Sequence, residues 1–146
     1  MPHDSLPHEL MTRSFYEALY PFSLRFNSRR TLSPGKLGVL RHLAEHGRAS
    51  TTELAAVVQV SQQAISLATK ELEHLGFTAR IPDDDDRRRT WITLTEAGQQ
   101  KLTEELDAGV TWLQTAIQER LSNDERAILR AAIPVLQKLG SEAADD

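Results

Sequence analysis

Apolar residues recur at helical spacing along most of the chain, and residues that start or stop helices bound each run. Ser33-Pro34 predicts the start of one helix and Gly47 its end. Ser50 to Glu53 fits a capping box that opens a short helix. After only Gln59-Val60, Ser61 caps another helix. This order predicts a helix-turn-helix.

The second helix of this pair, which begins after Ser61 and ends at Gly76, has two distinct faces. The inward stripe is expected to be Ile65, Ala68, Leu72 and Leu75. The outward face then carries Gln62, Gln63, Ser66, Leu67 and Lys70. Amide and hydroxyl groups on a projecting helix can contact base edges in a major groove. An ordinary amphipathic helix with its polar side in water fits the same pattern.

The hydrophobic period then changes from that of a helix to that of a strand. Residues 77–81 and 90–94 are β-branched or aromatic runs on either side of a polar turn, which predicts a hairpin with a long loop. The loop carries four aspartates followed by Arg87, Arg88 and Arg89. Arginines on such a loop can enter a minor groove or bind phosphates, provided that the aspartates turn away or pair with them. A solvated charged turn is the alternative, which the preceding helix-turn-helix disfavours.

Long amphipathic helices are predicted on both sides of this central region. Residues 10–26 form one bent helix or two shorter ones around Pro21. Thr95-Glu96 opens a helix with an apolar stripe from Leu102 to Leu121, and Ser122 to Glu125 is a second capping box, whose helix Pro134 is expected to kink. These stripes either pack on the central region or pair with a second chain.

The predicted fold is mainly α with a small β-hairpin wing: a winged helix-turn-helix flanked by N- and C-terminal dimerisation helices. We expect a single domain over residues 1–146. Its parts are an N-terminal helical region (8–30), the winged helix-turn-helix (33–95), the C-terminal helices (96–139) and a tail (140–146).

Composition narrows the function classes. The 146 residues include no cysteine, which excludes disulfides and thiol redox sensing, and no apolar run approaches the roughly 18–20 residues of a membrane span. A cytoplasmic protein without membrane contact is expected. The formal net charge of −4 does not favour nucleic acid, so a DNA-binding protein of this composition must concentrate its cations on one face.

The motifs between residues 53 and 98 are similar to the signature of the MarR family of transcriptional regulators. The matching residues are Glu53-Leu54-Ala55, Val60-Ser61, Ile65-Ser66, Leu72-Glu73, Gly76-Phe77, Arg80, Asp83, Asp86-Arg87-Arg88 and Leu94-Thr95-Glu96-Ala97-Gly98. The resemblance implies a homodimer formed by the first and last two helices. It makes Arg88 the minor-groove arginine and Asp86 the acid that positions it. The expected DNA-binding residues are Ser61, Gln62, Gln63, Ser66, Leu67, Lys70, Arg80, Arg87, Arg88 and Arg89.

Three positions depart from the family pattern. Gln59 stands where the turn often carries glycine, which predicts slight strain. Asp84 replaces a proline common in the wing, and Leu67 stands where a polar or basic side chain is frequent.

The resemblance also implies a small aromatic or phenolic effector that releases DNA. Phe15, Tyr16, Tyr20 and Trp112 are the aromatic residues that could line its pocket, although a role in the core is the ordinary alternative. No other cofactor is expected. His42 and His46 have the spacing of a metal pair, but no third ligand is evident and two surface histidines are the simpler interpretation.

These patterns together predict a sequence-specific regulator, more often a repressor than an activator, that binds a pseudo-palindromic operator in double-stranded DNA as a homodimer. Phosphate-loop and nucleophile-elbow motifs are lacking, so an enzyme is not expected. A winged-helix module that binds protein instead of DNA is the alternative.

Overall fold

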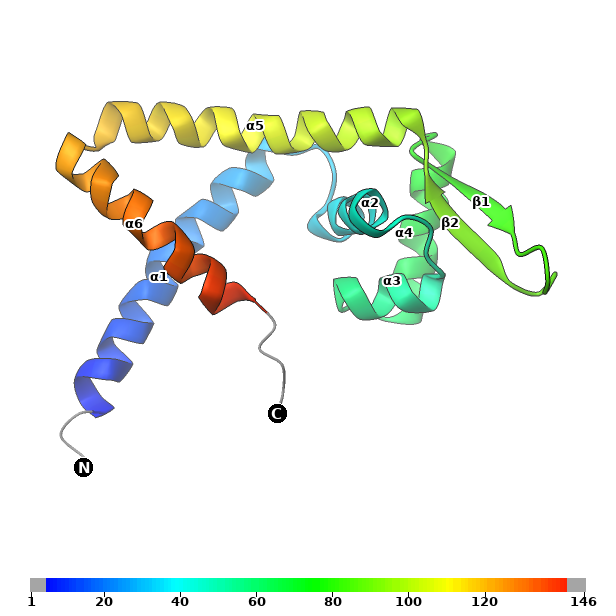
Figure 1. The fold of residues 1–146 in the computed structure, drawn as a ribbon, viewed down its shortest axis with the longest axis horizontal. Helices are drawn as coiled ribbons and strands as arrows, with labels where there is room; N and C mark the ends of the chain where they lie inside the picture. Colours follow the sequence, from blue (N-terminus) through cyan, green and yellow to red (C-terminus); the bar gives the residue numbers. More distant parts are fainter. Residues whose placement is uncertain (1–4, 142–146) are drawn as a thin grey trace. The chain divides into compact units, whose positions relative to one another are not determined.

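The computed structural model describes residues 5–141, and its side chains from residue 8. The chain divides into two compact units, residues 1–109 and 110–146. The elements in order are α1 (Ser5–Arg29), α2 (Pro34–His46), α3 (Thr51–Val58), α4 (Gln62–His74), β1 (Thr78–Pro82), β2 (Thr90–Leu94), α5 (Glu96–Arg120) and α6 (Asn123–Gly140). The prediction of a mainly helical fold with one small hairpin is confirmed (Figure 1).

Serines begin four of these helices, as their positions in the sequence predict. The side chains of Ser33, Ser50, Ser61 and Ser122 each accept a hydrogen bond from an amide in the first turn. At Ser122 the return bond from its own amide to Glu125 completes the capping box, whereas at Ser50 only the serine-to-amide half is formed. In the N-terminal region, α1 is one helix that runs through Pro21.

The core of the first unit lies among α2, α3, α4 and β2. Its buried apolar residues are Leu32, Leu37, Val39, Leu40, Leu43, Ala49, Leu54, Ala55, Ile65, Leu72, Ile92 and Leu102. The predicted inward stripe of α4 is right at Ile65 and Leu72 but wrong at Leu75, which is 52% exposed. Thr69 is buried instead, and its hydroxyl donates to the Ser66 carbonyl, which makes burial of this polar side chain possible.

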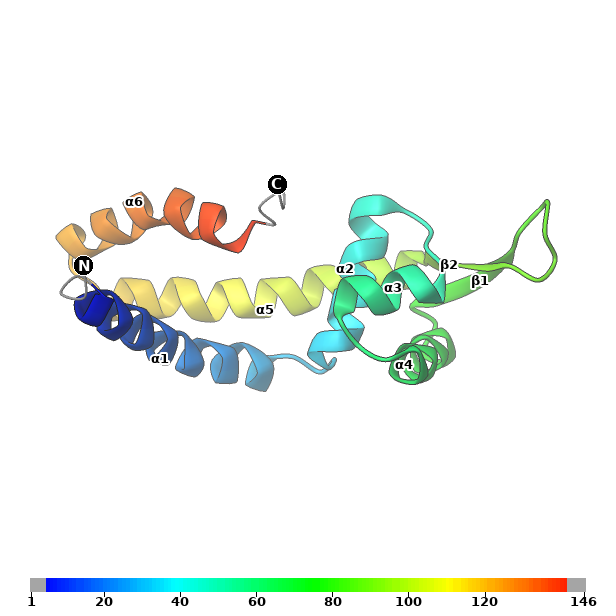
Figure 2. The same ribbon diagram turned by 90° about the horizontal axis from the view of Figure 1, so that it is seen from below.

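Strands β1 and β2 form an antiparallel hairpin that pairs Thr78 with Leu94 and Pro82 with Thr90. Ala49, in the loop before α3, adds an isolated bridge to Ile92 with N–O distances of 3.0 and 2.8 Å. The hairpin loop projects beyond α2, α3 and α4 (Figure 2). The base of the wing is therefore tied to the helix-turn-helix, while its tip is free to meet another molecule.

The segment Leu94 to Gly98 joins the wing to α5 through a close backbone approach. The Thr95 hydroxyl donates to the Gly76 carbonyl at 2.6 Å and accepts from the Gly98 amide at 3.0 Å. A Cβ atom at Gly98 would lie 2.0 Å from the Phe77 carbonyl oxygen. The close contact with the Phe77 carbonyl therefore requires glycine at position 98. The two hydrogen bonds of its hydroxyl favour threonine at position 95.

A buried carboxylate joins α5 to the segment between α1 and α2. Glu105 is 3% exposed and accepts from the Thr31 amide at 3.0 and 3.1 Å and from the Thr31 hydroxyl at 2.6 Å. Lys101 lies 3.3 Å away as its ion-pair partner. Burial raises the pKa of Glu105, but the hydrogen bonds from Thr31 and Lys101 outweigh it and hold the pKa below its ordinary value. Glu105 is therefore a charged anchor inside the first unit.

The described part of the second unit contains the end of α5 and the whole of α6. Arg126 connects them by donating to the Gln118 carbonyl at 2.9 Å. No residue of α6 is buried, although the helix carries six large apolar side chains. Within residues 5–141 no helix is long and apolar enough to cross a membrane.

Candidate nucleic-acid interface

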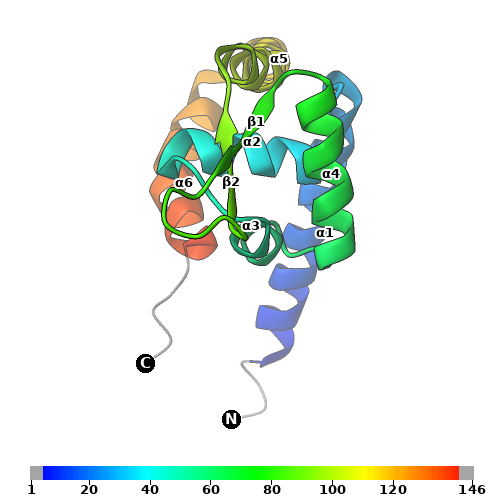
Figure 3. The ribbon, with the colours of Figure 1, turned by 90° about the vertical axis from the view of Figure 1, so that its right-hand side faces the viewer.

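Helix α4 lies along one side of the first unit, next to the wing (Figure 3). All of the residues expected on its outward face are exposed except Ser66, which is half-buried. Gln62 is already engaged, because its amide donates to the Thr51 hydroxyl at 3.0 Å. Gln63 and Lys70 have exposed polar ends, and Leu67 is 60% exposed. This face offers two polar side chains and one apolar contact to a groove.

The loop between β1 and β2 is held in shape by its own aspartates. The Asp86 carboxylate accepts from the Arg88 amide at 3.0 Å and pairs with the Arg88 guanidinium at 3.3 Å. Arg88 is nevertheless 92% exposed, and Arg87 and Arg89 are exposed beside it. The geometry has the form expected of an acid that positions an arginine, and the DNA-contacting role of Arg88 stays a prediction.

Asp83 organises the other side of the same loop. Its carboxylate accepts from the Asp85 amide at 2.9 Å and from the indole N–H of Trp91 at 3.2 Å. The hydrogen bond from the Asp85 amide is the largest cause that lowers the pKa of Asp83. Burial raises this pKa, but Trp91 and the Arg89 charge lower it further, so that it stays below its ordinary value. Two of the four aspartates thus stabilise the loop, as the sequence requires if its arginines are to face DNA.

Arg80, which was also expected to bind DNA, is paired within the chain. Its guanidinium lies 2.8 Å from the Glu73 carboxylate, and its side chain is about one-third exposed, at 32%. Part of its charge is therefore already neutralised. Arg80 joins β1 to α4, while the loop arginines project.

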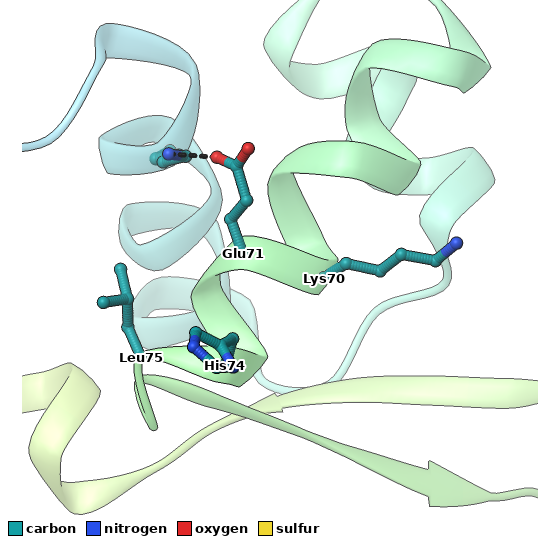
Figure 4. Close-up of a pocket in the computed structure, with 5 residues that line it drawn as sticks. Lys70, Glu71, His74 and Leu75 are labelled. Atoms are coloured by element: carbon teal, nitrogen blue, oxygen red, sulfur yellow. Dashed lines mark ion pairs between the residues drawn. The ribbon is translucent and has the colours of Figure 1, made fainter.

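A pocket of about 390 Å³ lies where α4 faces the start of α2. Its lining residues are Lys36, Lys70, Glu71, His74 and Leu75 (Figure 4). Lys36 forms an ion pair with Glu71, while Lys70 extends away from that pair. Leu75, which was expected in the inward stripe of α4, is exposed and lines this pocket instead.

The residues expected to line an effector pocket lie on two elements. Phe15, Tyr16 and Tyr20 are exposed on α1, with Phe15 the least so, and Trp112 is half-buried on α5. Trp112 belongs to the second unit and the other three to the first. Their role in binding an effector stays a prediction.

His42 and His46 lie with their ring centroids 4.6 Å apart and their ring planes tilted by 34°. His42 is mostly buried, and its Nε2 lies 3.7 Å from the Glu53 carboxylate. Among residues 5–141, no three His, Cys, Asp or Glu side chains are grouped closely enough to hold a metal ion.

The sequence-based prediction gave no role on this surface to Arg48 or Trp91. It also did not identify Asp83 as a hydrogen-bond acceptor within the loop. Arg48 and Trp91 are in cation–π contact but lie far apart in the sequence, so no local pattern links them. The one local signal for a contact between an arginine and this ring was that Trp91 lies two positions after the arginine run that ends at Arg89.

Comparisons with known proteins agree with this geometry. The model of the MarR family matches residues 32–90, which span the helix-turn-helix and most of the wing. The chain is 28% identical to the HTH-type transcriptional repressor MdtR of Bacillus subtilis over 94% of this chain and 86% of that protein. It is 32% identical to the uncharacterized HTH-type transcriptional regulator YwhA of the same organism over 67% of this chain and 70% of that protein.

A solved structure supports the fold. The crystal structure of a putative transcriptional regulator from Pseudomonas aeruginosa superposes with a TM-score of 0.82 at 24% identity, covering 94% of this chain and 98% of the other.

Proposed function

The chain belongs to the MarR family of DNA-binding transcriptional regulators, and from that premise we propose that it is a sequence-specific, ligand-responsive repressor that acts as a homodimer. The repressor assignment is supported by the name of the relative MdtR. The operator is proposed to be pseudo-palindromic, with half-sites about one helical turn apart. A cytoplasmic location follows from the proposed target.

One observation carries this proposal. An exposed polar helix face, α4, lies beside a projecting loop whose arginines Arg87, Arg88 and Arg89 are exposed. The acids that would repel DNA are partly engaged, because Asp83 and Asp86 accept hydrogen bonds within the loop. In a chain with a net charge of −4, the three loop arginines are thus exposed where a duplex can reach them.

The experiment is a gel shift of the protein against the DNA upstream of its own gene, with a random duplex of equal length as control. Neutralised phosphates release counterions, so binding is expected to weaken steeply with salt on both duplexes and to be tighter on the upstream DNA. Absent or salt-insensitive binding would overturn the proposal and favour the protein-interaction alternative, which receives no support from the relatives.

The proposed homodimer is supported by apolar side chains that the single chain leaves exposed. On α1 these are Leu10, Met11, Phe15, Tyr16, Leu19, Tyr20, Phe22 and Leu24. On α6 they are Ile128, Leu129, Ile133, Val135, Leu136 and Leu139. Apolar surface of this extent on a water-soluble chain indicates an interaction face.

The oligomeric state can be tested with two aspartate substitutions on α6. Leu136→Asp places a charge on the apolar stripe, whereas Ala127→Asp places it nine residues earlier, on the opposite side of the helix. Sedimentation equilibrium should give twice the 16.4 kDa chain mass for the wild type and the Ala127 variant, and a lower mass for the Leu136 variant. A monomeric wild type would remove the homodimer from the proposal.

A small aromatic or phenolic effector is the remaining part of the proposal. Its support is the set of exposed aromatic rings on α1, Phe15, Tyr16 and Tyr20. A panel of hydroxybenzoates, titrated into the complex with upstream DNA, should release the duplex from the wild type but less readily from Tyr16→Ala. Release that is equal in both proteins would exclude Tyr16 from the effector pocket.

A further inference from the structure

Trp91 interacts with three charged side chains in and next to the wing. This half-buried side chain on β2 donates its indole N–H to Asp83 at 3.2 Å. The guanidinium of Arg89 lies 5.6 Å from the ring centroid, and that of Arg48 lies 4.8 Å from it. Both distances are within the range in which an aromatic ring attracts a cation.

Arg48 belongs to the loop between α2 and α3, which is fixed next to β2. The adjacent residue, Ala49, exchanges two backbone hydrogen bonds with Ile92, the residue that follows Trp91. The contact between Arg48 and Trp91 therefore joins two segments whose backbones are already held in register. Figure 1 shows this loop running beside β2.

The charge of Arg48 has no carboxylate partner in the part of the chain that the structure describes. Arg41 pairs with Glu45 and Arg80 pairs with Glu73, but within residues 5–141 no carboxylate lies within ion-pair distance of Arg48. Arg89 has the nearby Asp83 charge, which its own charge in turn stabilises. Two guanidiniums gathered on one ring repel each other, and an anion bound to the uncompensated one would relieve that repulsion.

We propose that Arg48 is a further DNA-contacting residue, which binds a backbone phosphate beside the wing, and that Trp91 is the residue that positions it. A guanidinium whose face lies against a ring keeps its N–H groups available at its edge for phosphate oxygens. Because the ring also restricts the arginine, less conformational entropy is lost when the phosphate binds. This inference rests on the proposed DNA-binding role of the wing.

The test measures affinity for a labelled random-sequence duplex by fluorescence anisotropy across a range of salt concentrations. Removing one phosphate contact makes the negative slope of log affinity against log salt shallower by about 0.9 and weakens binding roughly eightfold at 0.1 M salt. Arg48→Ala is expected to show both changes. The matched control is Arg41→Ala, which removes the same charge from a residue already paired with Glu45 and should leave the slope unchanged.

The positioning role of Trp91 is tested by a double-mutant cycle. Arg48→Ala should cost roughly eightfold in the wild-type background but nearly nothing in the W91L background, because the arginine is then no longer held at the phosphate. Trp91→Phe, which keeps an aromatic face but loses the indole N–H, should retain most of the Arg48 effect. Thermal melts by circular dichroism establish that each variant is folded.

The outcomes separate this inference from the proposed function. A wild type that binds no duplex overturns both. A wild type that binds, with an unchanged salt slope in Arg48→Ala, overturns the Arg48 contact alone. Equal losses from Arg48→Ala in the wild-type and W91L backgrounds overturn the role of Trp91.

Discussion

At the scale of single residues, Gln59 adopts a backbone conformation that few side chains tolerate. It ends α3 with φ 61° and ψ 49°, and among residues 5–141 it is the one non-glycine residue with positive φ. The left-handed region costs an ordinary residue roughly 1–2 kcal/mol. The strain expected from the sequence, where glycine is usual in this turn, is therefore present.

We predict that Gln59→Gly increases the free energy of unfolding by about 0.5 kcal/mol. Relief of the left-handed cost exceeds the extra entropy that glycine adds to the unfolded chain. Urea denaturation of both proteins measures this difference. Gly47 and Gly76 also have positive φ, so Gly47→Ala is the reverse control and should destabilise. A destabilised Gln59 variant would mean that the Gln59 side chain makes a compensating contact.

Arg88 and Gln63 are expected to contribute to DNA binding in different ways. Arg88→Ala should weaken binding by about 1–3 kcal/mol on upstream and random DNA alike. Gln63→Ala should instead reduce the preference for upstream over random DNA. Gln63 is a cleaner test than Gln62, whose amide also joins α4 to Thr51. Competition binding with both duplexes measures these effects, and a Gln63 variant that loses affinity equally on the two would not be a base reader.

Contacts between residues close in the sequence could be predicted, whereas contacts between residues far apart in the sequence could not. Asp86 and Arg88 interact two positions apart, so the motif itself predicts their pairing. Arg48 and Trp91 meet only because the bridge from Ala49 to Ile92 forms. Thr69 is buried because its hydroxyl is satisfied within its own helix turn, which apolar periodicity does not detect.

At the scale of elements, the connection between the wing and α5 depends on a contact that only glycine permits. We predict that Gly98→Ala lowers the free energy of unfolding by about 3 kcal/mol, because its Cβ would overlap the Phe77 carbonyl oxygen. Gly35→Ala is the control, since its Cβ would meet Val58 at an ordinary 3.8 Å. Thermal melts compare the two, and a Gly98 variant as stable as the Gly35 variant would contradict the close approach.

Element boundaries were predictable where the signal is local. Three serine caps and the glycines at the ends of α2 and α4 place the helices of the central region, and Ser122 places the start of α6. The fate of Pro21 was left open, because one bent helix and two short ones have the same local pattern; the structure has one helix. The prediction that Leu75 belongs to the inward stripe was wrong. Helix α4 ends at His74, so Leu75 no longer follows the spacing that buries Ile65 and Leu72.

At the scale of the whole molecule, Glu105 connects segments that are 74 residues apart. Its pKa is lowered in the folded state, so its contribution to stability is complete above the ordinary value of 4.5 and is lost as the pH falls through the lower folded value. We predict that Glu105→Gln costs about 2 kcal/mol at neutral pH and removes part of the acid sensitivity below pH 4.5.

Urea denaturation at neutral and acidic pH tests this prediction. Glu104→Gln, an exposed neighbour on the same helix, is the control and should change neither quantity appreciably. An acid sensitivity that is identical in wild type and Glu105→Gln would show that other carboxylates account for it. No sequence motif marks this anchor, because a lone glutamate within a polar helix segment has no sequence signature.

None of the side chains of α6 is buried by the chain itself. If the partner that covers them is a second copy, as proposed, folding and association become a single equilibrium, and resistance to unfolding rises with the amount of protein present. A cell that makes few copies would then hold chains that open more often and reach proteases sooner. Abundance would thus set how long each copy survives as well as how often it occupies DNA.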